Sequence, residues 1–281
     1  MYLDPIGNQH PYKMNIIVCL KQILDPEVPV RDFSIDSSGL QADSACANQV
    51  TNIFCENALE TALQLKDLHG GKVIILSLGP ESVEDTLRKG LAMKADDAFI
   101  ILNDTGQIPD SAATAKTLAA GIRKIEPFDL ILVGRESGDW GAGQTGGLLA
   151  EELGLPFTAF VDEISPEGDD RLTLRQQTDS GWQKFSAPKP AVASITNSDH
   201  NLPRIPKTRD IIMANRKPVT RWTLEDLEIT PEHLSSSQSK ARVLTLSIPE
   251  SKSDCEFIEG DNIEEKIEKL AGKIAAITRS A

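Results

Sequence analysis

The residues best suited to binding a ligand lie in one glycine-rich stretch, Gly134–Gly147. It follows the apolar run 130–133 and precedes a segment with helical periodicity, so we expect it to join a strand to a helix. Glycine lets a backbone approach a ligand closely, and the first amides of a helix lack partners within the helix. With Gln144 and Thr145 as further donors, this chemistry suits a phosphate group.

Local features leave two interpretations of this stretch open. The lysine of the GxxxxGK[ST] phosphate loop is absent, and a merely flexible connection would explain the same glycines equally well. Asp139 is a common turn former, and Trp140 fits either a shield over a pocket or an ordinary loop side chain. The stretch alone therefore does not decide between a phosphate site and a loop.

Other reactive residue types form no recognisable set. The four cysteines, Cys19, Cys46, Cys55 and Cys255, show no CxxC pair and no metal-type spacing with the four histidines. No Ser–His–Asp arrangement, paired-carboxylate motif or HExxH is apparent. We therefore expect no metal, no self-contained catalytic site, and a reducing compartment in which Cys19 and Cys55 are small buried side chains.

Apolar runs alternate with helical periodicity in the first half of the chain. We expect strands at 15–20, 73–78, 98–102 and 130–133, and helices at 56–68, 81–93, 111–125 and 146–153. This alternation predicts an α/β fold with a doubly wound, mainly parallel sheet and helices on both faces. The loops after the strands then meet at one edge, where ligands usually bind.

The pattern changes after Pro156. Further strands are expected at 160–164, 171–177 and 192–196, an irregular basic segment at 203–217, and an amphipathic helix at 263–277; the polar excursion 24–48 suggests a small hairpin. We expect a disordered leader at 1–13, an α/β domain at 14–234 that includes the basic segment, and a C-terminal arm at 235–281. The helix of the arm suits contact with a partner subunit, and packing back on its own domain explains its apolar stripe equally well.

Composition and charge exclude some classes of partner. The net charge of −13 over 281 residues argues against nucleic acid and against an anionic membrane surface. No apolar run approaches the roughly 20 residues needed to span a bilayer, so no membrane insertion is expected. The polar opening stretch does not resemble a signal peptide. Cytoplasm is the expected location.

Several segments, in order, resemble the β subunits of electron transfer flavoproteins, the family that includes the FixA proteins. They are Val18–Asp25 (VCLKQILD), Asn52–Glu56 (NIFCE), Leu78–Pro80, Gly90–Met93, Ala95–Asp97, Gly134–Gly146, Arg204–Pro218 and Trp222–Leu227. The resemblance runs from Met14 to about Ile229. It implies an adenine-nucleotide α-hydrolase-like fold with an extended C-terminal arm.

The resemblance also implies a heterodimer. The α subunit would carry the redox-active FAD, and the β subunit would bind an adenine nucleotide, AMP or a second FAD. The pair would exchange electrons with acyl-CoA or other dehydrogenases, as in fatty acid oxidation, and with a quinone oxidoreductase or a ferredoxin. Because the flavin does the redox chemistry, the chain would be an electron-carrier subunit without a catalytic residue of its own.

Carried over to this sequence, the family's nucleotide site has a defined set of positions. It comprises Cys19, Asn52, Ile53, Phe54, Cys55, Leu78, Gly134, Ser137, Gly138, Asp139, Trp140, Gly143, Gln144, Thr145 and Gly146. The resemblance implies that Asn52 binds the adenine or ribose, and that Gln144, Thr145 and Gly146 hold the phosphate. Taken alone, Asn52 is explained more simply as a helix N-cap, and Lys21 as a solvated charge at a strand end.

A second set of positions is implied to dock a partner dehydrogenase, namely Ile205, Thr208, Ile211, Ile212 and Met213. The family usually has a Leu anchor where this chain has Thr208. The smaller, polar side chain would weaken such an anchor by about 1–2 kcal/mol. This departure puts the usual dehydrogenase partner in doubt, and an ordinary basic surface loop is the alternative.

The nucleotide itself is a choice between AMP and FAD. Family members that bifurcate electrons hold a second FAD and tend to resemble Asp-Gly-Asp-Thr-Ala-Gln-Val-Gly, whereas this chain has Ser-Gly-Asp-Trp-Gly-Ala-Gly-Gln-Thr-Gly. The bulky Trp140 would crowd a flavin diphosphate, and the Thr145 hydroxyl suits a terminal phosphate. AMP is therefore favoured.

Two other functions remain open from the sequence. A stand-alone adenine-nucleotide sensor of the universal-stress-protein kind shares the strand–loop–helix arrangement, but it gives the arm after Leu155 no purpose. An ATP-pyrophosphatase-type enzyme would require a Ser-Gly-Gly-x-Asp-Ser loop after the first strand, where this chain has Lys21–Asp25 (KQILD). The enzyme is the weakest of the three hypotheses.

Overall fold

The computed structural model describes residues 13–106, 108–235, 239–249 and 255–280. The leader predicted at 1–13 lies outside these residues, apart from Lys13. The chain divides into two compact units, 1–245 and 246–281.

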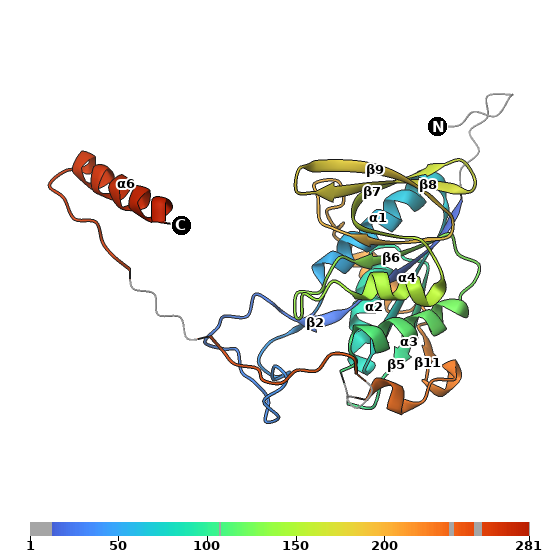
Figure 1. Ribbon diagram of the computed structural model, residues 1–281. Coiled ribbons are helices and arrows are strands. Elements are labelled where there is room, and N and C mark those ends of the chain that lie inside the picture. Colours follow the sequence, from blue (N-terminus) through green and yellow to red (C-terminus); the bar gives the residue numbers. More distant parts are fainter. Residues whose placement is uncertain (1–12, 107, 236–238, 250–254, 281) are drawn as a thin grey trace. The chain divides into compact units, whose positions relative to one another are not determined.

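The first unit is built on a nine-stranded sheet (Figure 1) with the order β11-β5-β4-β1-β6-β10-β7-β8-β9. Neighbours from β11 to β7 are parallel, whereas β7, β8 and β9 form an antiparallel meander at one end. The strands are β1 (Met14–Cys19), β4 (Gly71–Gly79), β5 (Asp97–Leu102), β6 (Leu130–Gly134), β7 (Phe157–Glu167), β8 (Arg171–Thr178), β9 (Gly181–Pro188), β10 (Ala191–Ile195) and β11 (Thr220–Trp222). The predicted mainly parallel α/β sheet is confirmed.

Helices cover both faces of the sheet. The helices α1 (Ile53–His69) and α2 (Glu84–Ala92) contribute to one hydrophobic cluster, and α3 (Ser111–Arg123) and α4 (Thr145–Leu153) to another. Alternate residues of β1 divide between the two: Ile16 and Val18 belong to the first cluster, Ile17 and Cys19 to the second. Because both faces are covered, β1 is apolar at every position except Asn15 and shows no polar alternation.

Three local expectations differ from the structure. The segment predicted as one helix at 81–93 begins with a 3₁₀ turn, η1 (Glu81–Val83), before α2. The segment 203–217, predicted to be irregular, contains the short helix α5 (Thr208–Ala214). Strand β9 was not predicted, because nearly all of its residues are exposed and its sequence lacks an apolar alternation.

The polar excursion is closed by a small second sheet. Strand β2 (Gln22–Leu24) pairs antiparallel with β3 (Gln49–Thr51). Between them, an isolated bridge joins Ile35 to Ala42 on either side of a turn at Asp36–Gly39, within the segment where a small hairpin was expected. This arrangement brings Asn52, which directly follows β3, beside the end of β1. There the backbone N–H of Asn52 donates to the Lys21 carbonyl over 2.9 Å.

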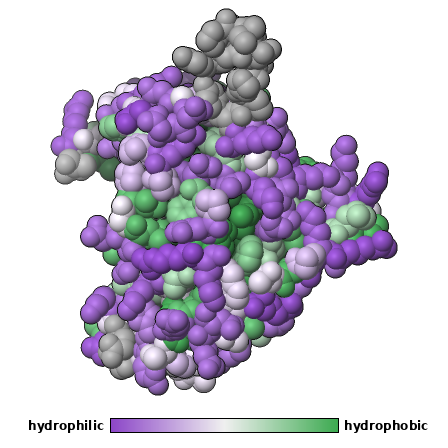
Figure 2. Space-filling view, turned by 90° about the vertical axis from the view of Figure 1, so that its right-hand side faces the viewer, coloured by the Kyte–Doolittle hydropathy of each residue, from purple (hydrophilic) through white to green (hydrophobic). Residues whose placement is uncertain are grey.

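The remaining helical segments follow β11. The 3₁₀ turns η2 (Glu225–Leu227) and η3 (Pro231–Leu234) belong to the first unit, and the second unit contains α6 (Ile263–Ser280). Within the part of the chain that the structure describes, no helix is long and apolar enough to cross a membrane. Figure 2 shows the side of the molecule nearest the start of β1, where hydrophilic side chains surround smaller hydrophobic patches.

Candidate functional site at the carboxyl edge of the sheet

The glycine-rich stretch connects β6 to α4, and its glycines have two separate roles. Gly141 and Gly143 have φ angles of +60° and +63°, a region that residues with a Cβ rarely adopt. Gly134 and Gly146 are instead sites of close packing. A Cβ on Gly134 would lie 3.0 Å from the Cys55 nitrogen, and one on Gly146 would lie 2.8 Å from Cγ2 of Val133.

The helix that follows presents free backbone donors. The first backbone hydrogen bond of α4 runs from the Leu148 amide to the Gln144 carbonyl over 3.1 Å. The amides of Thr145, Gly146 and Gly147 precede that bond, so they have no carbonyl available within the helix. Together with the positive end of the helix dipole, they favour an anion at this position.

Asn52 holds the glycine-rich loop in place. Its side chain is buried, with 1% exposed, and Nδ2 donates to the Glu136 carbonyl over 2.8 Å while Oδ1 accepts from the Gly138 amide over 3.1 Å. Asn52 does occupy the N-cap position of α1, but its side chain makes no capping hydrogen bond. The simpler interpretation of this residue as a cap is therefore wrong, because both ends of its amide face the loop backbone.

A second contact to the loop comes from Lys21. Its Nζ lies 2.7 Å from both carboxylate oxygens of Asp139 and donates to Ser137 Oγ over 3.2 Å. Asp139 also accepts from the Trp140 amide over 2.9 Å. Lys21 is thus not a merely solvated charge. Lys21 and Asn52 hold the loop from the end of β1 and the start of α1.

The two cysteines at this edge are unreactive by environment. Burial raises the pKa of the Cys19 thiol to about 12, with a further contribution from Cys55. Burial also raises the pKa of Cys55. Both thiols therefore stay protonated at neutral pH, and neither is a nucleophile under those conditions. Leu78, near the end of the neighbouring strand β4, is partly buried.

Arg135 is the site residue that sequence reasoning missed. Its guanidinium carbon lies 4.4 Å from the centroid of the Phe54 ring and 5.9 Å from that of Phe160. It also forms an ion pair with Glu136 at 2.7 Å and donates to Thr196 Oγ1 over 3.2 Å. A basic residue directly after a strand-end glycine was the available signal in the sequence.

The predicted nucleotide positions differ in how closely the structure joins them. Asn52, Ser137, Gly138 and Asp139 are linked by the hydrogen bonds above, and Gly134 packs on Phe54 and Cys55. Ile53, Trp140, Gly143 and Gln144 are exposed. Residues 141–146 also have the spacing GxGxxG, but β6 ends at Gly134, so they do not directly follow a strand as in the dinucleotide fingerprint.

The predicted docking positions lie elsewhere, on and just before α5. The exposed fractions are 91% for Ile205, 47% for Ile211, 51% for Ile212 and 50% for Met213. Thr208, the first residue of the helix, is exposed as well. Helix α5 contacts α2, and no described hydrogen bond joins it to the glycine-rich loop. The two sets of positions are therefore separate surfaces.

Comparisons with known proteins agree on one family. Residues 43–227 match the model of the electron transfer flavoprotein domain. The chain is 31% identical to the caffeyl-CoA reductase–Etf complex subunit CarD of Acetobacterium woodii, with 93% of this chain and 98% of that protein covered. It is 32% identical to the electron transfer flavoprotein β subunits of Clostridium acetobutylicum (88% and 92% covered) and Megasphaera elsdenii (94% and 98% covered).

Proposed function

Since the chain belongs to the electron transfer flavoprotein family and has the role of a β subunit in electron transfer, we propose that it binds one adenine nucleotide at the carboxyl edge of its sheet. The observation that carries the proposal is the loop from β6 to α4, which ends in free amides and is held by Asn52 and Lys21. An electron transfer subunit of this kind pairs with an α subunit, whose FAD supplies the redox chemistry.

AMP is the nucleotide that we propose. The free amides of Thr145–Gly147 and the Thr145 hydroxyl would hold its phosphate, and the ends of β1 and β4 would lie against the adenine. The single phosphate of AMP matches the single helix N-terminus in this loop, whereas FAD has two phosphates. Trp140, 46% exposed in the same loop, would crowd a flavin diphosphate. A second FAD in this place would instead indicate a bifurcating protein.

The partner oxidoreductase would dock on the exposed apolar residues of 205–213. These side chains form a hydrophobic surface within a basic segment, and they are Ile205, Ile211, Ile212 and Met213. Such a surface is complementary to a partner that has an apolar pocket surrounded by acidic residues. One relative is named as part of a complex with a caffeyl-CoA reductase, so oxidoreductases that act on CoA thioesters, including acyl-CoA dehydrogenases, are the partner class that we propose. A quinone oxidoreductase or a ferredoxin would be the other redox partner.

The C-terminal arm would contact the α subunit. Helix α6 exposes Ile263, Ile267, Leu270, Ile274 and Ile277 along one side, and each has an exposed fraction between 46% and 68%. The spacing of four, three, four and three residues matches the seam of a helix that packs against other helices. An exposed apolar stripe of this size indicates a binding surface, because its area is more stable against a partner than in contact with water.

Co-expression with an α subunit tests the proposal. We expect the purified pair to release one FAD and one AMP on denaturation, measured by chromatography of the released nucleotides. Release of two FAD per pair would mean that this chain binds FAD and not AMP. Release of a single FAD and no other nucleotide would contradict the proposed nucleotide site. The comparisons do not support the universal-stress-protein sensor. ATP recovered from a homodimer of this chain would be needed to revive that alternative.

A further inference from the structure

Helix α5 cannot be stable through its own packing. It has seven residues, and its one buried residue is Ala214. Ile211, Ile212 and Met213 remain about half exposed, so they contribute little to holding the helix. Isolated helices shorter than about 12 residues are marginal in water. The α5 helix therefore depends on contacts that other elements make with it.

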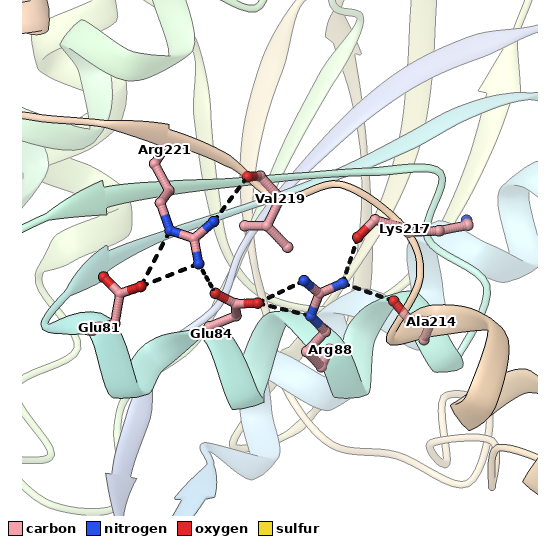
Figure 3. Close-up of polar contacts among 7 residues, drawn as sticks. All are labelled: Glu81, Glu84, Arg88, Ala214, Lys217, Val219 and Arg221. Carbon is pink, nitrogen blue, oxygen red and sulfur yellow. Dashed lines mark hydrogen bonds and ion pairs between the residues drawn. The ribbon is translucent and has the colours of Figure 1, made fainter.

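Arg88 of α2 makes the central contact. Its Nη1 donates to the Ala214 carbonyl over 2.8 Å and to the Lys217 carbonyl over 2.5 Å, at the C-terminal end of α5 (Figure 3). Carbonyls at a helix C-terminus lack partners in the helix and carry the negative end of its dipole. The Ala214 carbonyl, the last of α5, also accepts from the Lys217 amide over 3.1 Å, and Lys217 lies three residues beyond the helix. The guanidinium therefore joins the helix end to the turn that follows it, and it places a positive charge there, which stabilises the helix end.

Glu84 fixes the orientation of Arg88. Its Oε1 accepts from Nε of Arg88 over 2.9 Å and from Nη2 over 2.6 Å, a two-bond arrangement that leaves Nη1 directed at the carbonyls. Glu84 also binds Arg221, which in turn forms an ion pair with Glu81 at 3.1 Å (Figure 3). The side chains of Arg88 and Glu84 are each 21% exposed, so this pair is largely shielded from solvent screening.

Two further contacts hold the same segment. Lys94, just beyond α2, forms an ion pair with Asp210 in the first turn of α5, and the hydrogen bond from Lys94 lowers the pKa of the Asp210 carboxyl. The side chain of Lys217 donates to the Ala95 carbonyl over 2.8 Å. The Lys94 side chain is 57% exposed, against 21% for Arg88, and Lys217 makes its bond from outside the helix, whereas Arg88 bonds directly to the last carbonyl of α5. Arg88 is therefore the contact on which the helix end depends most.

We propose that Arg88 is a positioning residue that keeps α5 folded, so that Ile211, Ile212 and Met213 form a pre-ordered docking surface for the partner oxidoreductase. The inference rests on the docking role given to this surface above. A partner that binds only the ordered form of a segment has its apparent affinity reduced by the fraction that is ordered. Loss of Arg88 would lower that fraction while leaving every docking side chain unchanged.

Three variants of this chain, each in the heterodimer with its α subunit, test the structural half of the proposal. In Arg88→Ala, hydrogen–deuterium exchange of the amides of residues 209–217 should accelerate at least about tenfold, because hydrogen bonds from a charged donor are lost. Arg88→Lys should restore part of the protection, since a lysine can reach one carbonyl without the two-bond contact to Glu84. Arg216→Ala is the matched control: this exposed arginine lies in the same segment, and none of its described contacts involves the side chain. Amides of β1 and β4 should be unchanged throughout.

Steady-state electron transfer tests the docking half, with an acyl-CoA dehydrogenase as the probe that reduces the heterodimer and a dye as the final acceptor. Arg88→Ala should raise the KM for the heterodimer roughly three- to tenfold with kcat retained. Photochemical reduction of the bound flavin, which needs no docking, should proceed at the wild-type rate. Arg88→Lys should fall between Arg88→Ala and the wild type in KM.

The variant Ile212→Ser separates failure of this inference from failure of the docking role. If Ile212→Ser raises KM and Arg88→Ala does not, the surface docks the dehydrogenase but Arg88 does not position it, and the inference is overturned. If neither variant changes KM, the docking role itself fails and the inference falls with it. Unchanged exchange of α5 in Arg88→Ala overturns the inference whatever the kinetics.

Discussion

At the scale of single residues, two side chains hold the loop, one through its backbone and one through its side chains. Asn52 uses both ends of its amide for the loop, and the neighbouring Lys21 binds the two side chains Ser137 and Asp139. A buried amide with two backbone partners costs free energy if one partner is lost, because the other is left without a hydrogen bond. Loop geometry therefore depends on Asn52 before any ligand is considered.

Replacing Asn52 by alanine should loosen the loop and weaken nucleotide binding. The loss of two buried hydrogen bonds is worth about 1–3 kcal/mol, so the Kd for AMP should rise roughly ten- to hundredfold, as measured by calorimetry on the nucleotide-stripped heterodimer. Asn52→Asp keeps the acceptor for the Gly138 amide but sets a second oxygen against the Glu136 carbonyl, so it should lose at least as much. Asn48→Ala, at an exposed asparagine, is the control. An unchanged Kd in Asn52→Ala would show that the loop positions itself.

At the scale of elements, the start of α4 decides where a phosphate can lie. The helix begins over β6 and β7 because Gly146 leaves room for Val133 and Phe157, whose atoms would lie 2.8 and 3.0 Å from an added Cβ. The neighbouring Gly147 has only an ordinary contact of 3.5 Å with Phe157. Close approach is thus required at one glycine and not at the next.

This difference gives a matched pair of substitutions. Gly146→Ala should lower the free energy of unfolding by about 1–3 kcal/mol and displace the amides that bind phosphate, because the added methyl overpacks the helix start. Gly147→Ala should be neutral or stabilise by up to about 1 kcal/mol, since alanine favours helix. Urea denaturation and AMP titration of both variants check the prediction. Equal effects at the two positions would mean that packing at Gly146 is not what places the helix.

At the scale of the whole molecule, the chain presents surfaces that its own fold leaves uncovered. The antiparallel meander ends in β9, whose residues are mostly exposed, and the helix of the second unit, α6, carries an apolar stripe along one side. A net charge of −13 disfavours association of the chain with copies of itself through charged surface. The uncovered surfaces suit a different subunit, as the proposed heterodimer requires.

The stripe of α6 can be tested without touching the first unit. The double substitution Ile267→Ser and Ile274→Ser should weaken the heterodimer by about 3 kcal/mol, roughly a hundredfold in Kd, because two buried isoleucines are lost from the interface. Glu268→Ser with Arg279→Ser, on the opposite side of the helix and neutral in net charge, is the control. Sedimentation equilibrium measures the Kd. A heterodimer as tight as the wild type would exclude the stripe from the interface.

The sequence by itself determined the parallel α/β fold and the position of the loop. Buried parallel strands are continuous apolar runs, and the glycines between β6 and α4 mark close approach and unusual φ angles, so both features are local and visible in the chain. The family resemblance rested in part on segments at the same edge, namely Val18–Asp25, Asn52–Glu56, Leu78–Pro80 and Gly134–Gly146.

Only the tertiary structure decided what the polar side chains do. The role of Asn52 depends on Glu136 and Gly138, more than eighty residues away, and the order of α5 depends on Arg88, 126 residues before Ala214. Local patterns predict a cap for the first and an irregular segment for the second, since neither partner lies within reach in the sequence. Hydrogen bonds between distant segments carry no periodicity, and folding alone brings their donors and acceptors together.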